Sequence, residues 1–276
     1  MSSKYPDFSL AFLSLADVEP IEMAKIASMC GYKMMGVRLL PATIDEPPYR
    51  ILTDKKYRKD FISVLADTGI KVADVEIIRL NRDTNINEYR NFFDCCSEIG
   101  ATNVVVVGDD LNSIRLSENF SKLCELAISY GLWMNLEAIP WTEIKDLQVA
   151  LDVVKKANHT NAVVLVDAYH FSRRKTPIEV LNLVTPDISN IFQICDGSSI
   201  FDTASEAIRI AARTARLVPG EGEIDLLSMI SKIPRTTIVS IEVPSRFLMT
   251  MFSPLERARH LLDATKLVYD KSDYCR

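Results

Sequence analysis

Residues 130–137 read YGLWMNLE, and this octapeptide carries the pattern that predicts the fold. Gly131 follows a segment with helical periodicity, and glycine adopts at little cost the left-handed conformation that ends a helix. The apolar run after it is typical of a strand that is buried on both faces of a parallel sheet. Glu137 then places a carboxylate at the end of that strand. Helix, turn, buried strand and polar end together make one repeating unit of an α/β protein.

The same arrangement recurs along the chain, because Gly31, Gly69 and Gly100 also separate a helical segment from an apolar run. The expected strands span residues 8–13, 34–40, 71–78, 103–108, 132–137, 162–167, 190–195 and 237–242. Amphipathic helical segments between them include residues 20–29, 54–67, 86–98, 117–129, 144–157 and 255–269.

Eight strands alternating with helices predict an α/β fold of the (β/α)8 TIM-barrel type. An open doubly wound sheet is the main alternative, but no G-x-G-x-x-G motif follows the first expected strand. No linker or low-complexity tract divides the chain. We therefore expect a single barrel domain over residues 1–270 and a C-terminal tail over residues 271–276.

The composition limits the partners that this protein can have. Its 32 basic and 37 acidic residues give a net charge of −5, so no global positive field attracts nucleic acid. No apolar run approaches the length of about 20 residues that spans a bilayer, and no signal peptide is evident. The six cysteines show no C-x-x-C spacing and are typical of reduced thiols. We expect a cytoplasmic protein with a small-molecule substrate, and the sequence leaves a homo-oligomer open.

Polar side chains end the last four expected strands. These side chains are Glu137, Asp167, Gln193 and Glu242. The carboxyl ends of barrel strands meet at one rim, where barrel enzymes have their active sites. Three carboxylates packed together there need a positive charge to neutralise them. Carboxylate and amide oxygens suit Mn²⁺ or Mg²⁺ better than Zn²⁺, so we predict one divalent ion held by all four residues, with Co²⁺ or Zn²⁺ as the remaining alternatives.

Other candidate residues lie on or near the same rim. His170 is three residues beyond Asp167, and we expect it to orient substrate or to act as an acid or base. Trp141 follows the fifth strand and Arg38 ends the second, and we expect both to face the pocket and contact substrate. Arg216 precedes a Pro-Gly-Glu-Gly-Glu segment, and we expect it to contact an anionic substrate.

These residues resemble the pattern of the sugar phosphate isomerase/epimerase family of xylose isomerase-like TIM barrels. The similarity extends from about residue 8 to residue 268 and is strongest between Asn135 and Glu242. The resemblance implies that the four strand-end residues are the metal ligands, with glutamine at a position that is usually histidine. It also implies that Glu143, six residues after the first ligand, contacts substrate.

A subset of bacterial 3-dehydroshikimate dehydratases is similar in finer detail. Glutamine on the seventh strand, the E-A-x-x-W motif at residues 137–141 and the D-x-x-H motif at residues 167–170 are shared with that subset.

Three hypotheses follow for the function. The favoured one is a metal-dependent isomerase or epimerase of a small sugar, sugar phosphate or polyhydroxy-ketone that reacts through an enediolate. Glu137 and Glu242 would move the proton. The second is a dehydratase, in which His170 gives a proton to the leaving hydroxyl group. The third is a sugar-binding barrel without catalytic activity.

Overall fold

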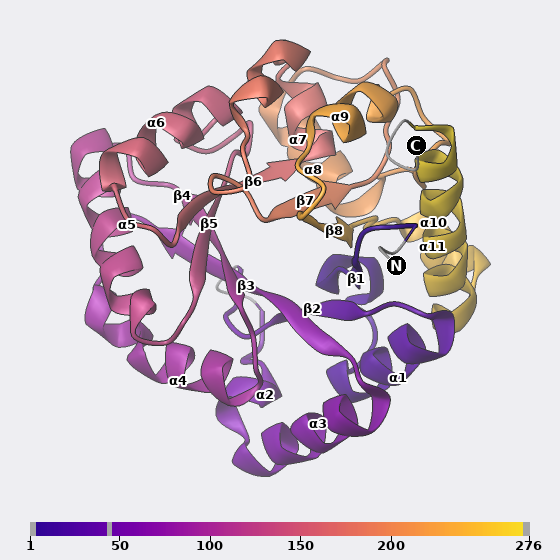
Figure 1. The fold of residues 1–276 in the computed structure, drawn as a ribbon, viewed down its shortest axis with the longest axis horizontal. Coiled ribbons are helices and arrows are strands. Elements are labelled where there is room, and N and C mark those ends of the chain that lie inside the picture. The colour runs from indigo at the N-terminus through magenta and orange to yellow at the C-terminus, as the bar shows by residue number, and fades with distance from the viewer. Residues whose placement is uncertain (1–3, 43–45, 273–276) are drawn as a thin grey trace.

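Eight parallel strands form a closed barrel with helices around it (Figure 1), in a computed structural model that describes residues 4–42 and 46–272. The strands are β1 (Phe8–Leu10), β2 (Met34–Arg38), β3 (Lys71–Leu80), β4 (Asn103–Gly108), β5 (Trp133–Glu137), β6 (Ala162–Asp167), β7 (Ile191–Ile194) and β8 (Ile238–Ile241). Each strand pairs with the next, and β8 pairs with β1. The prediction of a single TIM barrel is confirmed.

Helices follow the strands in the order that the sequence predicts. They are α1 (Pro20–Cys30), α2 (Arg50–Thr53), α3 (Lys55–Thr68), α4 (Arg90–Glu98), α5 (Ser113–Ile128), α6 (Leu147–Ala157), α7 (Ala168–Arg173), α8 (Ser205–Thr214), α9 (Leu226–Lys232), α10 (Arg246–Met251) and α11 (Pro254–Lys271). Short 3₁₀ helices occupy Phe12–Leu15, Ile86–Tyr89 and Ile178–Leu183. Of the predicted tail at 271–276, Lys271 ends α11, and residues 273–276 lie outside the described residues.

Local signals in the sequence set the ends of the helices. The Asp54 carboxylate accepts hydrogen bonds from the backbone N–H groups of Lys56 and Tyr57, both at 3.0 Å, and so caps the first turn of α3. Gly69 ends that helix with a φ of 69°, in the left-handed region that glycine adopts without strain. The chain then turns directly into β3.

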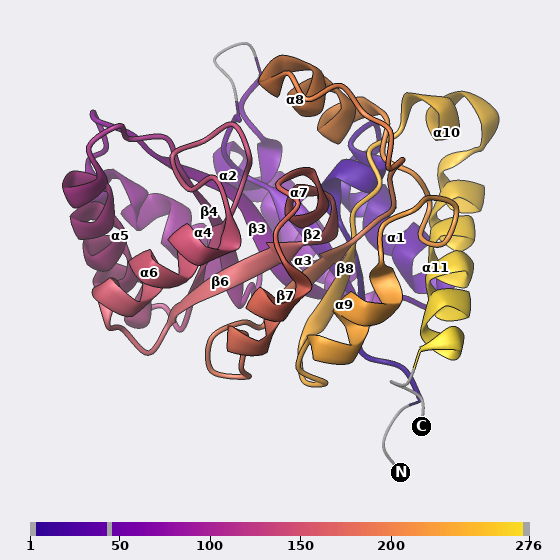
Figure 2. The same ribbon diagram turned by 90° about the horizontal axis from the view of Figure 1, so that it is seen from above.

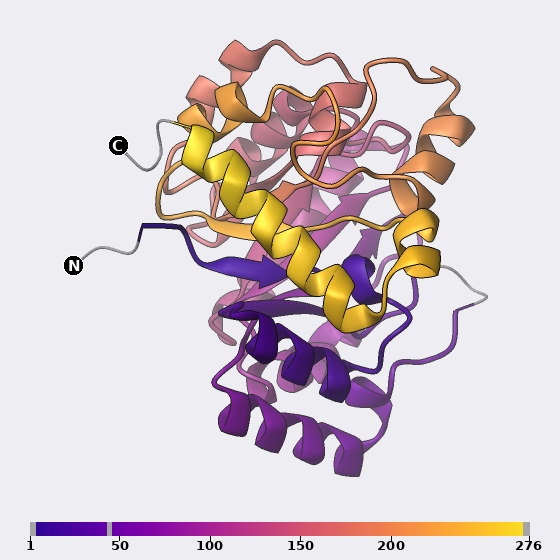
Figure 3. The ribbon, with the colours of Figure 1, turned by 90° about the vertical axis from the view of Figure 1, so that its right-hand side faces the viewer.

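Helix α11 covers the place where the barrel closes. Figure 3 shows α11 lying across the molecule beside α1 and β1. Pro254 occupies its first turn, and Ser253 and Glu256 form a capping box at its start. The Tyr32 hydroxyl donates to the Ala258 carbonyl at 2.9 Å, which ties the start of β2 to this helix. The first and last elements of the chain are thereby held together.

The two ends of the barrel differ. Figure 2 shows α8 and α10 at one end, above the carboxyl ends of the strands, and the last turn of α11 at the other. Barrel enzymes have their active sites at the carboxyl end.

The inside of the barrel is apolar on one side and polar on the other. One buried cluster consists of Ile77, Val105, Val107, Ile139, Leu165 and Ile191. On the other side, Ser9, Asp74 and Ser240 are buried, and each has a side-chain oxygen without a hydrogen-bond partner in the described part of the chain. The neighbouring Gly36 leaves room for Asp74, because a Cβ at that position would lie 2.8 Å from the carboxylate.

The composition led to two expectations, one about membrane-spanning segments and one about the oxidation state of the cysteines. Within the described residues, none of the helices combines the length and the apolar character that crossing a membrane requires. Five cysteines are described and all are free thiols, whereas Cys275 lies outside the described residues.

Candidate active site

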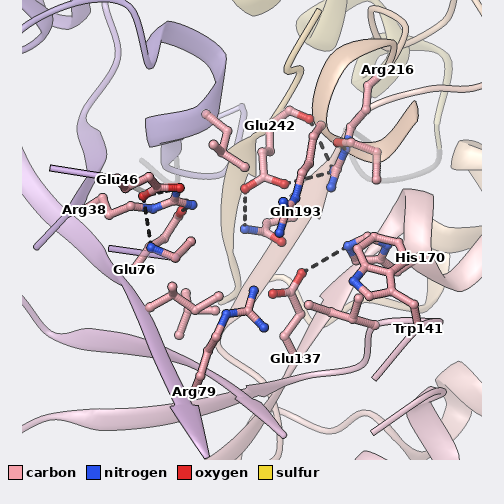
Figure 4. Close-up of a pocket in the computed structure, with 17 residues that line it drawn as sticks. Arg38, Glu46, Glu76, Arg79, Glu137, Trp141, His170, Gln193, Arg216 and Glu242 are labelled. Carbon is pink, nitrogen blue, oxygen red and sulfur yellow. Dashed lines mark hydrogen bonds and ion pairs between the residues drawn. The ribbon is translucent and has the colours of Figure 1, made fainter. Parts of the chain in front are cut away.

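A cavity of about 170 Å³ opens at the carboxyl end of the barrel (Figure 4). It is smaller than the pockets of about 300–1,000 Å³ that hold drug-sized ligands, so it suits a small molecule. Its lining includes Arg38, Glu46, Glu76, Arg79, Glu137, Trp141, His170, Gln193, Arg213, Arg216 and Glu242.

The strand-end residues predicted from the sequence lie close together at this end of the barrel. Glu137 ends β5, Asp167 ends β6, Gln193 lies in β7, and Glu242 follows β8 directly. All four side chains are buried; Glu137, Gln193 and Glu242 line the cavity, whereas Asp167 is not among its lining residues. Asp167 and Gln193 are neighbours in the strand register, and Gln193 is in turn the register partner of Ser240, two residues before Glu242.

Arg216 joins two of these carboxylates. Its Nη1 atom lies 2.7 Å from Asp167 Oδ2 and 2.9 Å from Glu242 Oε2, and its side chain is 3% exposed. Two short backbone bridges position the arginine, since Ala215 pairs with Ser245 and Leu217 pairs with Asp196. The prediction from sequence placed Arg216 against a substrate; the structure places it on the cavity wall with its charge already paired to protein carboxylates.

Gln193 continues this network on the other side of Glu242. Its Nε2 atom donates to Glu242 Oε1 at 2.9 Å, as Figure 4 shows. Its Oε1 atom is buried and has no hydrogen-bond partner among the described residues. A buried amide oxygen without a partner costs free energy unless a ligand or water contacts it.

His170 lies beside Glu137. The Nε2 atom of His170 is 3.5 Å from Glu137 Oε1, and the indole of Trp141 meets the imidazole edge-on with 5.1 Å between ring centroids. The backbone N–H of His170 donates to Asp167 at 2.8 Å, which caps α7 and fixes the histidine relative to that carboxylate. The structure thus brings together His170, Trp141 and Glu137 as the sequence predicts.

Burial controls the ionisation of the site. Burial, followed by the nearby Asp167 and Glu242, raises the pKa of Glu137 well above its ordinary value. Burial also raises the pKa of Glu242 to about 8, although Arg216 opposes the shift. Burial lowers the pKa of His170 to about 4, so its imidazole is neutral at pH 7. Asp167 differs, because Arg216 and His170 outweigh its burial and lower its pKa.

These observations fit a divalent cation. Three buried carboxylates face one guanidinium group, which leaves two negative charges uncompensated when all three are ionised. Glu137, Asp167 and His170 each offer one ligand atom, and these atoms lie within 4.8 Å of one another. The free Oε1 of Gln193 is a further oxygen donor. Oxygen-rich sites of this kind suit Mn²⁺ or Mg²⁺, and a histidine nitrogen also permits Zn²⁺ or Co²⁺.

The structure places two of the predicted substrate contacts in different surroundings. Arg38 lines the cavity and pairs with Glu76 at 2.5 Å and with Glu46 at 3.6 Å, so its charge is already paired with carboxylates of the protein. Glu143 does not line the cavity and its side chain is exposed. The neighbouring Ile144 is buried against the end of β4 instead, which turns Glu143 outward.

Three residues at or near the cavity were not predicted from the sequence: Arg79, Glu46 and the buried Asp74. Arg79 lies near the end of β3 and lines the cavity, and a basic residue at a strand end was the signal available for it. The spacing of Asp74 and Glu76 by two residues indicates that both face the barrel interior. Glu46 lies on a loop and has no comparable signal.

The Pro-Gly-Glu-Gly-Glu segment closes over Asp196. The Asp196 carboxylate accepts backbone hydrogen bonds from Gly197, Gly220 and Ile224 at 2.8 to 3.0 Å. Gly222 has no room for a side chain here, because a Cβ would lie 2.3 Å from the same carboxylate. This aspartate therefore holds the loop that follows Arg216.

Comparisons with known proteins agree with this geometry. The profile of a family described as "xylose isomerase-like TIM barrel" matches residues 24–267. The inosose isomerase of Bacillus subtilis (strain 168) is 25% identical over 194 residues, which cover 63% of this chain and 66% of that protein. The match thus spans just under two thirds of the curated relative.

Two solved structures share the fold. The IOLI protein, solved with a bound zinc atom, has a TM-score of 0.77 and 20% identity, covering 96% of this chain and 98% of that one. The probable 3-DHS dehydratase AsbF of Bacillus anthracis has a TM-score of 0.74 and 12% identity, covering 94% and 98%. The profile match covers most of the sequence. The chain therefore belongs to the xylose isomerase-like TIM barrel family, which is a family of enzymes.

Proposed function

We propose that this protein is a divalent-metal-dependent isomerase or epimerase of a small polyhydroxy-ketone. The observation that carries the proposal is the pair of buried glutamates, Glu137 and Glu242, that line one small cavity. Both have a pKa raised by burial, and general acid–base catalysis is most efficient when the pKa of the catalytic group lies near the working pH. The inosose isomerase of Bacillus subtilis, a sequence relative, supports the reaction class.

The two glutamates divide the proton transfer between them. In its ionised form one carboxylate removes the proton from the carbon next to the substrate carbonyl, and the electron pair moves onto the carbonyl oxygen. The other carboxylate, protonated, returns a proton to carbon. Return to the opposite face of the same carbon gives the epimer. Return to the former carbonyl carbon gives the isomer, provided that the hydroxyl group on the first carbon passes its proton to the former carbonyl oxygen and becomes the new carbonyl. His170 is neutral beside Glu137 and orients the substrate hydroxyl groups.

Glu137, Asp167, Gln193 and Glu242 are the residues that we propose hold the metal ion, with His170 close by. A bound divalent ion would polarise the substrate carbonyl and stabilise the negative charge that develops on its oxygen. The chain itself contributes Arg216, which pairs with Asp167 and Glu242, orients both side chains, and favours the ionised form of Asp167. Trp141 and the apolar cluster around Val105 exclude water from one side of the cavity.

A dehydratase is the second candidate function. It would use the same proton removal, after which the electron pair expels the hydroxyl group on the next carbon. The protonated glutamate would complete the leaving water, and the neutral His170, which the sequence suggested as the acid, would donate a hydrogen bond to it. The favouring observation is that His170 lines the cavity and that its Nδ1 atom is buried without a partner among the described residues. The solved dehydratase AsbF adopts the same barrel.

Proton exchange separates the candidates. The Mn²⁺-loaded protein is incubated in deuterated buffer with a panel of ketoses, inososes and 3-dehydroshikimate, and the products are followed by ¹H NMR. Deuterium entering next to the carbonyl, with a new epimer or isomer and no alkene, supports the proposal. Loss of water with a new alkene supports the dehydratase. If the metal-loaded protein exchanges no proton of any substrate, both are wrong and a non-catalytic sugar-binding barrel remains.

A further inference from the structure

Guanidinium groups from three further elements line the cavity besides that of Arg216. Arg38 comes from β2, Arg79 from β3 and Arg213 from α8, whereas Arg216 is paired with Asp167 and Glu242. Basic side chains from separate elements that converge on one cavity raise the question of what they bind. The three differ in how many of their donors the protein already uses.

The charge of Arg38 is paired with two carboxylates of the protein. The guanidinium group lies 2.5 Å from Glu76 and 3.6 Å from Glu46, and it stacks over Phe12 with 4.8 Å to the ring centroid. Its Nε atom is buried and has no hydrogen-bond partner among the described residues. Its side chain is buried. We therefore assign Arg38 to the wall of the cavity.

Arg79 is only partly engaged. Its Nη1 atom lies 2.6 Å from Asp109 Oδ2, but its Nε atom is buried and has no hydrogen-bond partner among the residues described. Figure 4 shows the side chain pointing into the cavity. A guanidinium group has five N–H donors in a planar fork, so Arg79 keeps donors for a ligand.

Arg213 has no hydrogen bond or ion pair with any residue in 4–42 or 46–272. Desolvation, followed by the positive charges of Arg79, Arg209 and Arg38, lowers its pKa. Like charges that repel one another at the mouth of a cavity are stabilised when an anion binds between them. The exposed Arg213 side chain is also accessible to a ligand that enters.

From this geometry we propose that Arg79 and Arg213 form an oxyanion-binding subsite, which holds a carboxylate or phosphate group of the substrate. The inference rests on the proposed function and narrows it to an anionic polyhydroxy-ketone. Guanidinium groups bind both oxyanions through paired charge-assisted hydrogen bonds. A neutral sugar would leave these donors unpaired, so the subsite discriminates between anionic and neutral substrates.

Three polyols that lack a ketone test the subsite without turnover. Glucitol is neutral, gluconate carries a carboxylate, and glucitol 6-phosphate carries a phosphate on the same carbon chain. Binding of each to the Mn²⁺-loaded protein is measured by isothermal titration calorimetry at low and high salt. We expect at least one anionic polyol to bind about tenfold more tightly than glucitol, which corresponds to about 1.4 kcal/mol. The tighter of the two identifies the oxyanion.

Three variants and one matched control assign the preference to particular residues. Arg79→Gln and Arg213→Gln should each remove most of the anion preference and leave glucitol binding unchanged, while Arg213→Lys should retain part of the preference. Arg209→Gln is the control, because Arg209 lies on the same helix and pairs with Glu206 at 2.6 Å but does not line the cavity. Equal binding of all three polyols, or a preference that survives both variants, would overturn the subsite.

The measurement is independent of catalysis. Because none of the probes can be isomerised, a failure of the proton-exchange experiment leaves the binding result intact. Conversely, exchange on neutral ketoses together with equal polyol binding would retain the proposed function and reject the subsite. Circular dichroism of each variant confirms that it folds, and metal analysis confirms that it holds the same amount of Mn²⁺.

Discussion

The Nη1 atom of Arg216 lies 2.7 Å from Asp167 Oδ2, and both side chains are buried at the carboxyl end of the barrel. The same nitrogen lies 2.9 Å from Glu242 Oε2, so one guanidinium group links the ends of β6 and β8. A buried ion pair of this kind adds little net stability, but removing one partner leaves the other charge uncompensated. Arg216 therefore connects the stability of the protein to the charge of its candidate site.

Replacing Arg216 with Met should destabilise the metal-free protein by about 3–5 kcal/mol, because Asp167 and Glu242 lose their buried counter-charge. Addition of Mn²⁺ should restore part of this loss if the ion binds the same carboxylates. Urea unfolding in EDTA and in Mn²⁺ measures both effects. Arg82→Met is the control, since Arg82 is 80% exposed and its pair with Asp83 contributes little. Equal effects of the two variants would contradict the prediction.

Replacing Glu242 with Gln should abolish turnover while the barrel still folds. The amide cannot accept or return a proton at carbon, and loss of one acid–base group slows a reaction by about 10²–10⁴-fold. The apparent melting temperature should stay the same or rise, because a buried carboxyl group with a pKa of about 8 is removed. Glu125→Gln changes an exposed carboxylate on α5 and should leave turnover unchanged. Normal turnover in the Glu242 variant would remove Glu242 from the mechanism.

The amide of Gln193 should be needed for metal binding. We expect Gln193→Leu, which removes the unpartnered Oε1 donor, to weaken Mn²⁺ binding by at least about tenfold. Gln193→His should keep a ligand atom and bind metal. Metal content after dialysis, measured by mass spectrometry, and titration with Mn²⁺ give the affinities. Gln148→Leu, on the exposed face of α6, is the matched control. Unchanged affinity in Gln193→Leu would show that the glutamine is not a ligand.

The carboxyl group of Asp74, buried inside the barrel, should make the free energy of unfolding fall as the pH rises. Burial, followed by the charge of Glu76, raises the pKa of Asp74 from 3.8 to about 8. The folded state thus binds a proton that the unfolded state releases between these values. This carboxyl group lowers the free energy of unfolding by up to about 1.4 kcal/mol per pH unit over that window.

The Asp74→Asn variant removes this dependence. We expect it to match the parent protein near pH 4 and to become progressively more stable than the parent up to pH 8. Urea unfolding at several pH values measures the difference. Asp94→Asn, an exposed substitution on α4, controls for a change of net charge. A constant difference between Asp74→Asn and the parent at all pH values would mean that Asp74 is ionised in the folded protein.

Short-range patterns in the sequence predict most of this fold. The strands at 103–108 and 162–167 are predicted to the residue, because each apolar run is bounded by a polar or glycine residue on both sides. Gly31, Gly69, Gly100 and Gly131 all have positive φ, as their position after helical segments predicts. Helix α5 begins four residues earlier than predicted, since Asn112 caps its first turn.

The candidate site is predictable only in part. Glu137, Asp167, Gln193 and Glu242 follow from their places at the ends of strands, because barrel closure brings those ends together. The pairing of Arg216 with Asp167 joins residues 49 positions apart, and no local pattern indicates it. The family resemblance implies a substrate contact for Glu143, yet the direction of a loop side chain depends on which neighbour is buried, and here that neighbour is Ile144.

Position 216 has a consequence for redesigning this protein. Its backbone N–H donates to the Pro244 carbonyl at 3.2 Å, and the flanking residues pair with the segments after β7 and β8. The peptide framework, and not the arginine side chain, sets the direction of the Cα–Cβ bond at this position. A library of substitutions confined to this single codon would thus vary charge and shape at the cavity wall without redirecting the side chain, and each member would carry the loss of stability that follows from removing the guanidinium group.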